Sequence, residues 1–222
     1  MLPYVIVFNA VSLDGLTEGF DADVELYYQL VSTWNVDAHL AGCDTMLKGD
    51  EELADVGDSA GPPTPIDSQD PRPLLVVPDS RGRLRKWRSY RDLPYWRGGV
   101  ALCSLSTPQE YLEHLVQWGV PYLIAGQDHV DYRAGLELLN LHFGVRRVHV
   151  DSGGTLNGLL VAAGLVSEIN LLVHPLIVGS HRKRHFLGSL DRHPSFGPLG
   201  LELVRRETLR NHTVWLSYRV VP

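Results

Sequence analysis

The chain has 222 residues, of which 44% are hydrophobic and 21% charged, and its formal net charge is −6. This length and composition suit a globular chain with a sizeable core and argue against disorder. The negative charge argues against a nucleic-acid binder that works through general basicity. The only cysteines, Cys43 and Cys103, make a disulfide framework improbable and are typical of a reducing cytoplasm.

The first eight residues lack a basic segment and have only a short apolar run, so they predict a core strand rather than a signal peptide. No stretch of about 18 apolar residues occurs, so no transmembrane helix is expected. We therefore expect a cytoplasmic protein without a membrane partner.

Hydrophobic periodicity predicts strands and helices that alternate along most of the chain. In chain order, the prediction is a strand at 5–8, a helix at 22–33, a strand at 36–41, a helix capped by Asp44 or Thr45 and running toward Leu53, a proline-rich loop at 57–73, a strand at 74–77, a strand at 98–103, a helix at 107–119, a strand at 122–125, a helix at 132–143, a strand at 145–150, a helix at 155–163, a strand at 168–174, a loop at 178–200, and two strands at 201–208 and 213–221.

This order predicts an α/β fold in three layers. The alternating elements predict a mostly parallel sheet covered by helices on both faces. The last two strands follow one another around Arg210 and Asn211, so they predict an antiparallel edge. We expect residues 1–222 to form a single domain.

The segment from Asp151 to Leu156 is the most informative local motif. It joins a predicted strand to a predicted helix through Ser152, Gly153 and Gly154. Glycines let the main chain approach a ligand, and a helix N-terminus offers free N–H groups to an anion. The segment therefore predicts a phosphate or diphosphate site. The alternative is a plain strand-to-helix turn, which needs only one glycine.

Four segments occur in an order that resembles the riboflavin-pathway pyrimidine reductases. They are residues 11–15 (VSLDG), 36–48 (VDAHLAGCDTMLK), 73–80 (PLLVVPDS), and 150–156 (VDSGGTL) with 164–170 (GLVSEIN) after it. The resemblance implies a dihydrofolate-reductase-like fold, NADPH as hydride donor and a homodimer. It also implies a phosphorylated pyrimidine substrate whose ribosylamino group is reduced to a ribitylamino group. Because no deaminase domain precedes these segments, a stand-alone reductase is expected.

The resemblance assigns cofactor contacts to three parts of the chain. Ser152, Gly153, Gly154, Thr155 and Leu156 match the family's cofactor loop. Gly42 and Thr45 match a second cofactor segment, although both also suit a helix cap. Ser80 matches a position near the adenosine end of NADPH.

The arginines after Ser80 are charged groups that suit a 2′-phosphate. Arg81 and Arg83 carry guanidinium forks that pair well with phosphate oxygens, and the alternative is a solvated basic turn.

The remaining assignments lie beside the nicotinamide. Asp14, with Gly15, matches the family's Leu-Asp-Gly, and the Ala10 main chain would lie near the carboxamide; an ordinary turn is the alternative. Asp151 stands where the family generally carries Glu, and its carboxylate would orient the pyrimidine or the ribose hydroxyls. Either Asp151 in its protonated form or solvent would protonate the imine nitrogen. Asp14 and Asp151 are thus the candidate catalytic residues.

The chain departs from the family in its substrate half. The family's substrate-binding Ser and Arg are not evident in residues 17–30, and residues 49–52 read GDEE where relatives carry Asp-Asp-Pro. The basic segment His181–His185 is a candidate for a substrate phosphate, or a solvated face. Two alternatives therefore stay open: a reductase of another small imine, carbonyl or pterin-like compound, and a nucleotide-binding protein without catalysis.

Overall fold

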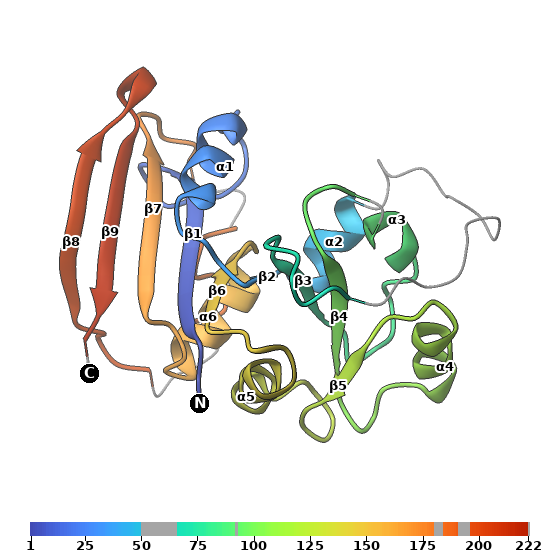
Figure 1. The fold of residues 1–222 in the computed structure, drawn as a ribbon. Coiled ribbons are helices and arrows are strands. Elements are labelled where there is room, and N and C mark those ends of the chain that lie inside the picture. Colours follow the sequence, from blue (N-terminus) through green and yellow to red (C-terminus); the bar gives the residue numbers. More distant parts are fainter. Residues whose placement is uncertain (50–65, 92, 180–183, 191–195, 222) are drawn as a thin grey trace. The chain divides into compact units, whose positions relative to one another are not determined.

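The computed structural model describes residues 1–49, 66–91, 93–179, 184–190 and 196–221 (Figure 1). The strands in this part of the chain are β1 (Tyr4–Ser12), β2 (Ala38–Leu40), β3 (Leu74–Pro78), β4 (Gly98–Cys103), β5 (Tyr122–Ile124), β6 (Arg147–Val150), β7 (Glu168–His174), β8 (Leu201–Thr208) and β9 (Val214–Val220). The α-helices are α1 (Val24–Ser32), α2 (Cys43–Gly49), α3 (Trp87–Arg91), α4 (Gln109–Gln117), α5 (Tyr132–Phe143) and α6 (Gly154–Ala162).

The strands form a nine-stranded sheet in the order β5-β4-β3-β2-β6-β1-β7-β9-β8. Strand β1 runs parallel to β7, and β3 runs parallel to both β2 and β4. Strand β9 is antiparallel to β7 and β8. The predicted mostly parallel sheet with an antiparallel C-terminal edge is therefore confirmed. Strand β8 contains an irregularity in its pairing between Leu203 and Arg205.

Most predicted elements are present, and the differences have local causes. Strand β1 extends to Ser12 because the polar residues Asn9 and Ser12 are buried, which the apolar run alone did not indicate. Helix α3 was not predicted, because five residues are too few to show a helical period.

The predicted start of α2 was wrong. The helix begins at Cys43, and the Gly42 carbonyl accepts hydrogen bonds from the amides of Thr45 and Met46. Asp44 and Thr45 therefore lie in the first turn rather than at the cap. The predicted end of this helix near Leu53 lies outside the described residues, as does most of the predicted loop at 57–73.

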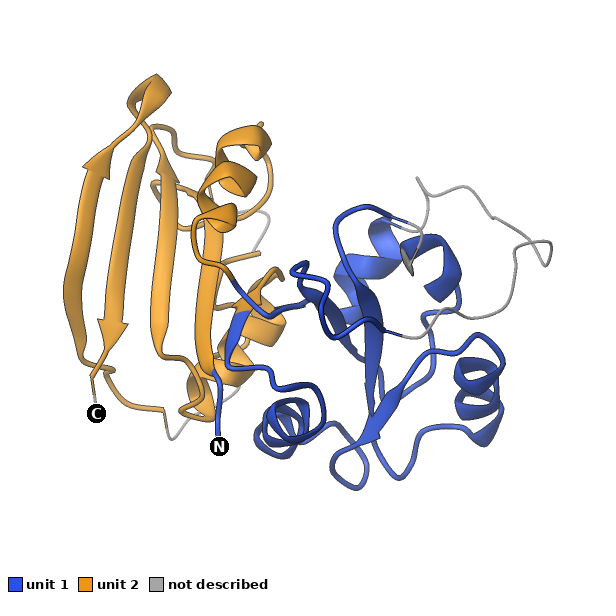
Figure 2. Cartoon of the chain, in the orientation of Figure 1, with its two compact units in different colours: residues 1–3, 36–148 blue, residues 4–35, 149–222 orange. Residues whose placement is uncertain are grey.

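The chain divides into two compact units (Figure 2). Unit 1 comprises residues 1–3 and 36–148. Its core contains Leu75, Val77 and Ala101 of the sheet, packed with Trp87 of α3 and Tyr111 of α4. The Trp87 indole Nε1 donates a hydrogen bond to the Tyr111 hydroxyl at 2.9 Å, so the polar atoms of this aromatic pair are satisfied inside the core.

Unit 2 comprises residues 4–35 and 149–222 and contains three layers. On one face of its sheet, Phe8 of β1 and Leu172 of β7 pack against α1 through Tyr27. Successive residues of a strand point to opposite faces, and the next residue, Asn9, accepts a hydrogen bond from Asn157 of α6. Helices α1 and α6 therefore cover opposite faces, as predicted. The prediction of a single domain stays a prediction.

Among the described residues, no helix is long and apolar enough to cross a bilayer. The longest of the described helices, α5, has twelve residues, whereas a span needs about 20.

Helix α5 provides a matched test of the core. Leu139 is fully buried, whereas Leu141 on the same helix is 74% exposed. We predict that Leu139→Ala lowers the free energy of unfolding by about 2–5 kcal/mol, because the cavity adds to the lost transfer energy. Leu141→Ala is the control and should change it by less than about 0.5 kcal/mol. Chemical denaturation measures both values, and equal effects would contradict the assigned face of the helix.

Candidate functional site

The turn from β6 to α6 leaves the N-terminus of a helix open. Gly153 is the N-cap with φ −79° and ψ 179°, and no side chain among the described residues caps the helix. The first amides of a helix have no acceptor within the helix itself. Gly153 and Thr155 are exposed, so solvent can reach this end of the helix, where N–H groups can bind an anion.

Gly153 and Gly154 of this turn differ in the space around them, so they are glycines for different reasons. A Cβ at Gly153 would meet no atom within 4 Å, so the space beside Gly153 is open. A Cβ at Gly154 would collide with the main-chain oxygen of His185 and the amide nitrogen of Gly188. Gly154 is therefore explained by close packing of two main chains, and of the two glycines only Gly153 has open space beside it.

Leu156 is held by burial, and Ser152 is held by hydrogen bonds to its carbonyl. Leu156 is 4% exposed, so only its main chain is available to a ligand. The Ser152 carbonyl accepts hydrogen bonds from Asn9 Nδ2 at 2.9 Å and Asn157 Nδ2 at 3.2 Å. Both asparagines are buried, and the sequence analysis missed them. The signal that could have found them is a polar residue within an otherwise apolar strand or helix. They hold the turn in one conformation.

Asp151 lies between β6 and this turn and contacts two tyrosines of α1. The Tyr27 hydroxyl is 3.3 Å from its Oδ1, and the Tyr28 hydroxyl is 3.1 Å from its Oδ2. The carboxylate is half-buried, directly before the open helix end. Neither tyrosine was singled out from the sequence, because only the apolar face of the helix was considered.

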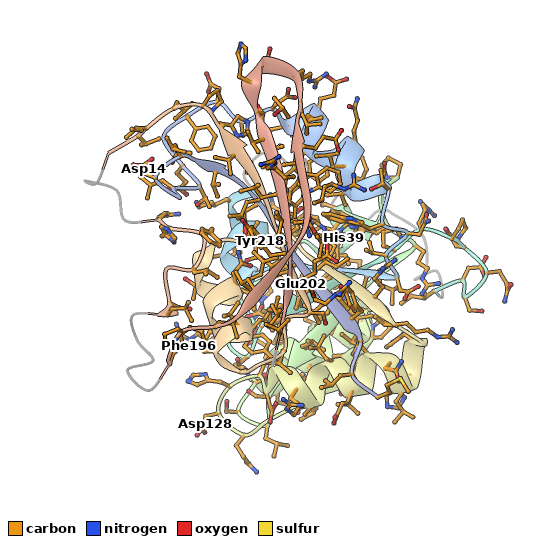
Figure 3. All side chains as sticks on the ribbon, turned by 90° about the vertical axis from the view of Figure 1, so that its left-hand side faces the viewer. Asp14, His39, Asp128, Phe196, Glu202 and Tyr218 are labelled. Carbon is orange, nitrogen blue, oxygen red and sulfur yellow. The ribbon has the colours of Figure 1, made fainter. Side chains whose placement is uncertain are left out.

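Asp14, labelled in Figure 3, lies in the loop after β1 and is held by its own unit. It accepts a hydrogen bond from the Ser12 hydroxyl at 2.6 Å and from the Gly179 amide at 2.9 Å. These bonds lower the pKa of Asp14 to about 2, so the carboxylate stays ionised at neutral pH. The contacts thus give Asp14 a role in the loop, and its predicted catalytic role stays a prediction.

Two further predicted positions belong to unit 2. Ala10 pairs with Leu172 in the sheet and packs against the apolar cluster under α1. In the basic segment 181–185, residues 181–183 lie outside the described residues. The Arg184 guanidinium forms an ion pair with Glu18 at 2.8 Å, which partly neutralises its charge.

Unit 1 brings the other predicted cofactor residues together. Gly42 and Thr45 follow β2, while Ser80 and Arg81 follow β3. These strands are parallel neighbours, so their carboxyl ends lie at the same edge of the sheet. An ion pair between Arg83 Nη1 and Asp44 Oδ1 at 2.7 Å joins the two segments directly.

The turn after β3 is built by Asp79. Its buried carboxylate accepts hydrogen bonds from the main-chain amides of Arg83 and Leu84 at 2.6 and 2.8 Å. This bonding closes the turn and leaves the Arg81 side chain exposed. Arg83 is already paired with Asp44, so Arg81 is the better candidate for a ligand phosphate.

Asp14 of unit 2 follows the parallel strand β1, and the candidates of unit 1 follow the parallel strands β2 and β3, at the ends where α/β proteins bind their ligands. Unit 2 thus presents an uncapped helix N-terminus next to a half-buried carboxylate, and unit 1 presents an exposed arginine after β3. Residues 3–215 match the RibD C-terminal domain family, and the chain belongs to this family.

The chain is similar to two archaeal proteins named 2,5-diamino-6-ribosylamino-4(3H)-pyrimidinone 5′-phosphate reductase. It is 31% identical over 188 residues to that of Archaeoglobus fulgidus, covering 81% of this chain and 83% of the relative. It is 29% identical over 217 residues to that of Methanothermobacter thermautotrophicus, covering 94% of each chain.

Two solved structures support the fold. A pyrimidine reductase-like protein from Corynebacterium diphtheriae matches with a TM-score of 0.73 at 15% identity, covering 99% of this chain and 92% of that chain. The dihydrofolate reductase of Schistosoma mansoni matches with a TM-score of 0.50 at 14% identity, with full coverage of both chains. The predicted dihydrofolate-reductase-like fold is therefore confirmed.

The two glycines can be tested separately. We predict that Gly154→Ala lowers the free energy of unfolding by about 1–3 kcal/mol, because the added methyl group overpacks two main chains. Gly153→Ala, where the space is open, should lower it by less than about 1 kcal/mol. Thermal and chemical denaturation measure the difference, and equal losses would contradict the close packing at Gly154.

Proposed function

We propose that this chain is an NADPH-dependent reductase of the riboflavin pathway. The proposed reaction reduces 2,5-diamino-6-ribosylamino-4(3H)-pyrimidinone 5′-phosphate to its ribitylamino form. The observation that carries the proposal is the similarity to relatives of that name over 81% and 94% of the chain. Membership of the RibD C-terminal domain family supports it independently.

In each unit taken by itself, the candidate residues suit one part of a nicotinamide dinucleotide. The open space at Gly153 and the uncapped start of α6 suit the diphosphate, which would bind the main-chain amides of residues 153–156. Gly42 and Thr45 would form a second cofactor-binding segment. The Ala10 main chain would lie near the carboxamide. Ser80 and Arg81 would bind the 2′-phosphate that distinguishes NADPH from NADH.

The cofactor supplies the hydride for carbon C1′ of the substrate, and the protein supplies placement and exclusion of water. Asp151 would orient the ribosylamino group and protonate the imine nitrogen. Asp14, held as a carboxylate by Ser12 and Gly179, would help to shape the pocket beside the nicotinamide.

We also propose a cytoplasmic homodimer. Leu201, Leu203 and Val204 of β8 are about half-exposed, and an apolar face of this kind suits a second copy. Figure 3 labels Glu202 and Tyr218, which lie on β8 and β9. Trp215 of β9 is 5% exposed and belongs to the core cluster under α1, so it is not part of this face.

A second candidate is a reductase of the same fold that acts on another small imine, carbonyl or pterin-like compound. The departures in residues 17–30 and 49–52 favour it, because these segments correspond to the family's substrate half. A nucleotide-binding protein without catalysis is the remaining alternative.

Turnover tests these functions directly. We predict that the purified chain consumes NADPH when the ribosylaminopyrimidine phosphate is added, measured by the loss of absorbance of the reduced nicotinamide. Consumption with a pterin or another imine instead would favour the second candidate. Saturable NADPH binding without turnover on any of these compounds would favour the non-catalytic alternative.

The preference for NADPH provides a second test. We predict that Arg81→Ala raises the KM for NADPH by about tenfold or more and leaves the KM for NADH unchanged, because only NADPH carries the 2′-phosphate. Arg146→Ala is the matched control, since this exposed arginine precedes β6 at the opposite, amino end of the strand. Equal losses with both cofactors would contradict the role of Arg81.

A further inference from the structure

The two oxygens of Asp151 are each held by a tyrosine from consecutive positions of α1. Consecutive helical residues differ by about 100° in direction, so Tyr27 and Tyr28 reach the carboxylate from different surroundings. Tyr27 is 8% exposed, whereas Tyr28 is 51% exposed. Oδ1 is therefore held from the interior and Oδ2 from the solvent side.

Tyr27 is fixed by tight packing. Its ring stacks on Phe8 with centroids 4.5 Å apart and an interplanar angle of 3°. Its hydroxyl lies 3.1 Å from the Phe8 carbonyl and 3.3 Å from His149 Nε2, in addition to Asp151 Oδ1. The hydroxyl is thus placed by β1, β6 and the ring stack together.

The protonation states of this cluster are set by burial. Burial, assisted by the nearby Asp151 carboxylate, raises the pKa of Tyr27 well above its usual value, so the hydroxyl keeps its proton. Burial lowers the pKa of His149 to about 3, so its ring is neutral at physiological pH. Neither the tyrosine nor the histidine therefore changes its protonation state near neutral pH.

The Tyr27 hydroxyl can keep its hydrogen bond to Asp151 in both protonation states of the carboxyl group. A hydroxyl has one proton to donate and two lone pairs to accept with. When Asp151 is ionised, Tyr27 donates to Oδ1. When the carboxyl group carries a proton on Oδ2, the oxygen on the solvent side, Tyr27 still donates to Oδ1. Oδ1 keeps its partner in both states, with no movement of heavy atoms.

We propose that Tyr27 is a positioning residue that holds Asp151 while the carboxyl group gives up and regains a proton. The inference rests on the proposed function. As hydride forms the new C–H bond at C1′, the C=N bond becomes single, and the proton moves from Asp151 to the nitrogen. Solvent water then returns a proton to the carboxylate.

The test compares Tyr27→Phe, Asp151→Asn and the double variant by kcat and by KM for NADPH. Tyr27→Phe removes only the hydroxyl and should lower kcat about tenfold with an unchanged KM for NADPH, because it misplaces the proton donor. Asp151→Asn should lower kcat about 100-fold or more. The double variant should match Asp151→Asn within about twofold, because Tyr27 acts only through the carboxyl group.

Tyr90→Phe is the matched control. It also removes one buried tyrosine hydroxyl, which donates to the Met46 carbonyl, and it lies in unit 1. Its kcat should stay within about twofold of the wild type, and near-ultraviolet circular dichroism checks that each variant is folded. If Tyr27→Phe does not fold, Asp151→Glu in the wild-type background gives a second test: the longer side chain displaces the carboxyl group from Tyr27 and should lower kcat about tenfold.

The outcomes separate the two proposals. An unchanged kcat in Tyr27→Phe would overturn the positioning role while leaving the proposed function in place. The same follows if Tyr27→Phe lowers kcat by the same factor in the wild-type chain and in Asp151→Asn. If Asp151→Glu keeps the kcat of the wild type, the positioning role is also overturned. Absence of turnover by the wild-type chain would overturn the proposed function, and the role of Tyr27 with it.

Discussion

The close approach of two main chains at Gly154 is the constraint on which the turn after β6 depends. Because Gly154 has no side chain, the segment from His185 to Gly188 packs directly on the start of α6. The Asn157 amide donates to the Phe186 carbonyl at 3.0 Å and to the Asn9 side chain at 2.7 Å, which ties the same segment to β1. The helix end, the Ser152 carbonyl and the segment from His185 to Gly188 are therefore joined within unit 2.

The fold was largely predictable because its elements repeat simple patterns. Strands β4 and β7 and helix α5 were predicted with their observed bounds. The two strands are short, mostly apolar runs typical of central strands, and the apolar residues of α5 recur with the helical period. Helix α3 was missed because it is short. The start of α2 was misplaced because capping was sought in the side chains of Asp44 and Thr45, whereas the Gly42 carbonyl begins the helix.

The candidate site was predictable only where a motif marks it in one stretch of chain. The glycine turn, Gly42 and Ser80 could be selected because each belongs to a local pattern. Tyr27 and Asn157 could not, because their importance comes from partners 124 and 148 residues away in sequence. The meaning of Gly154 also depended on a distant segment, because the sequence does not show that His185 lies against it.

The edge strand β8 carries features that disfavour pairing with strands of other chains. Strand β8 exposes apolar side chains at the end of a nine-stranded sheet, which is the arrangement that templates cross-chain strand addition. The irregular pairing between Leu203 and Arg205 interrupts its ladder, and Glu202, Arg205 and Glu207 place charge along it. Bulges and charges of this kind blunt a sheet edge, so the apolar side chains of β8 remain available for face-on packing while open-ended, fibre-like stacking is disfavoured.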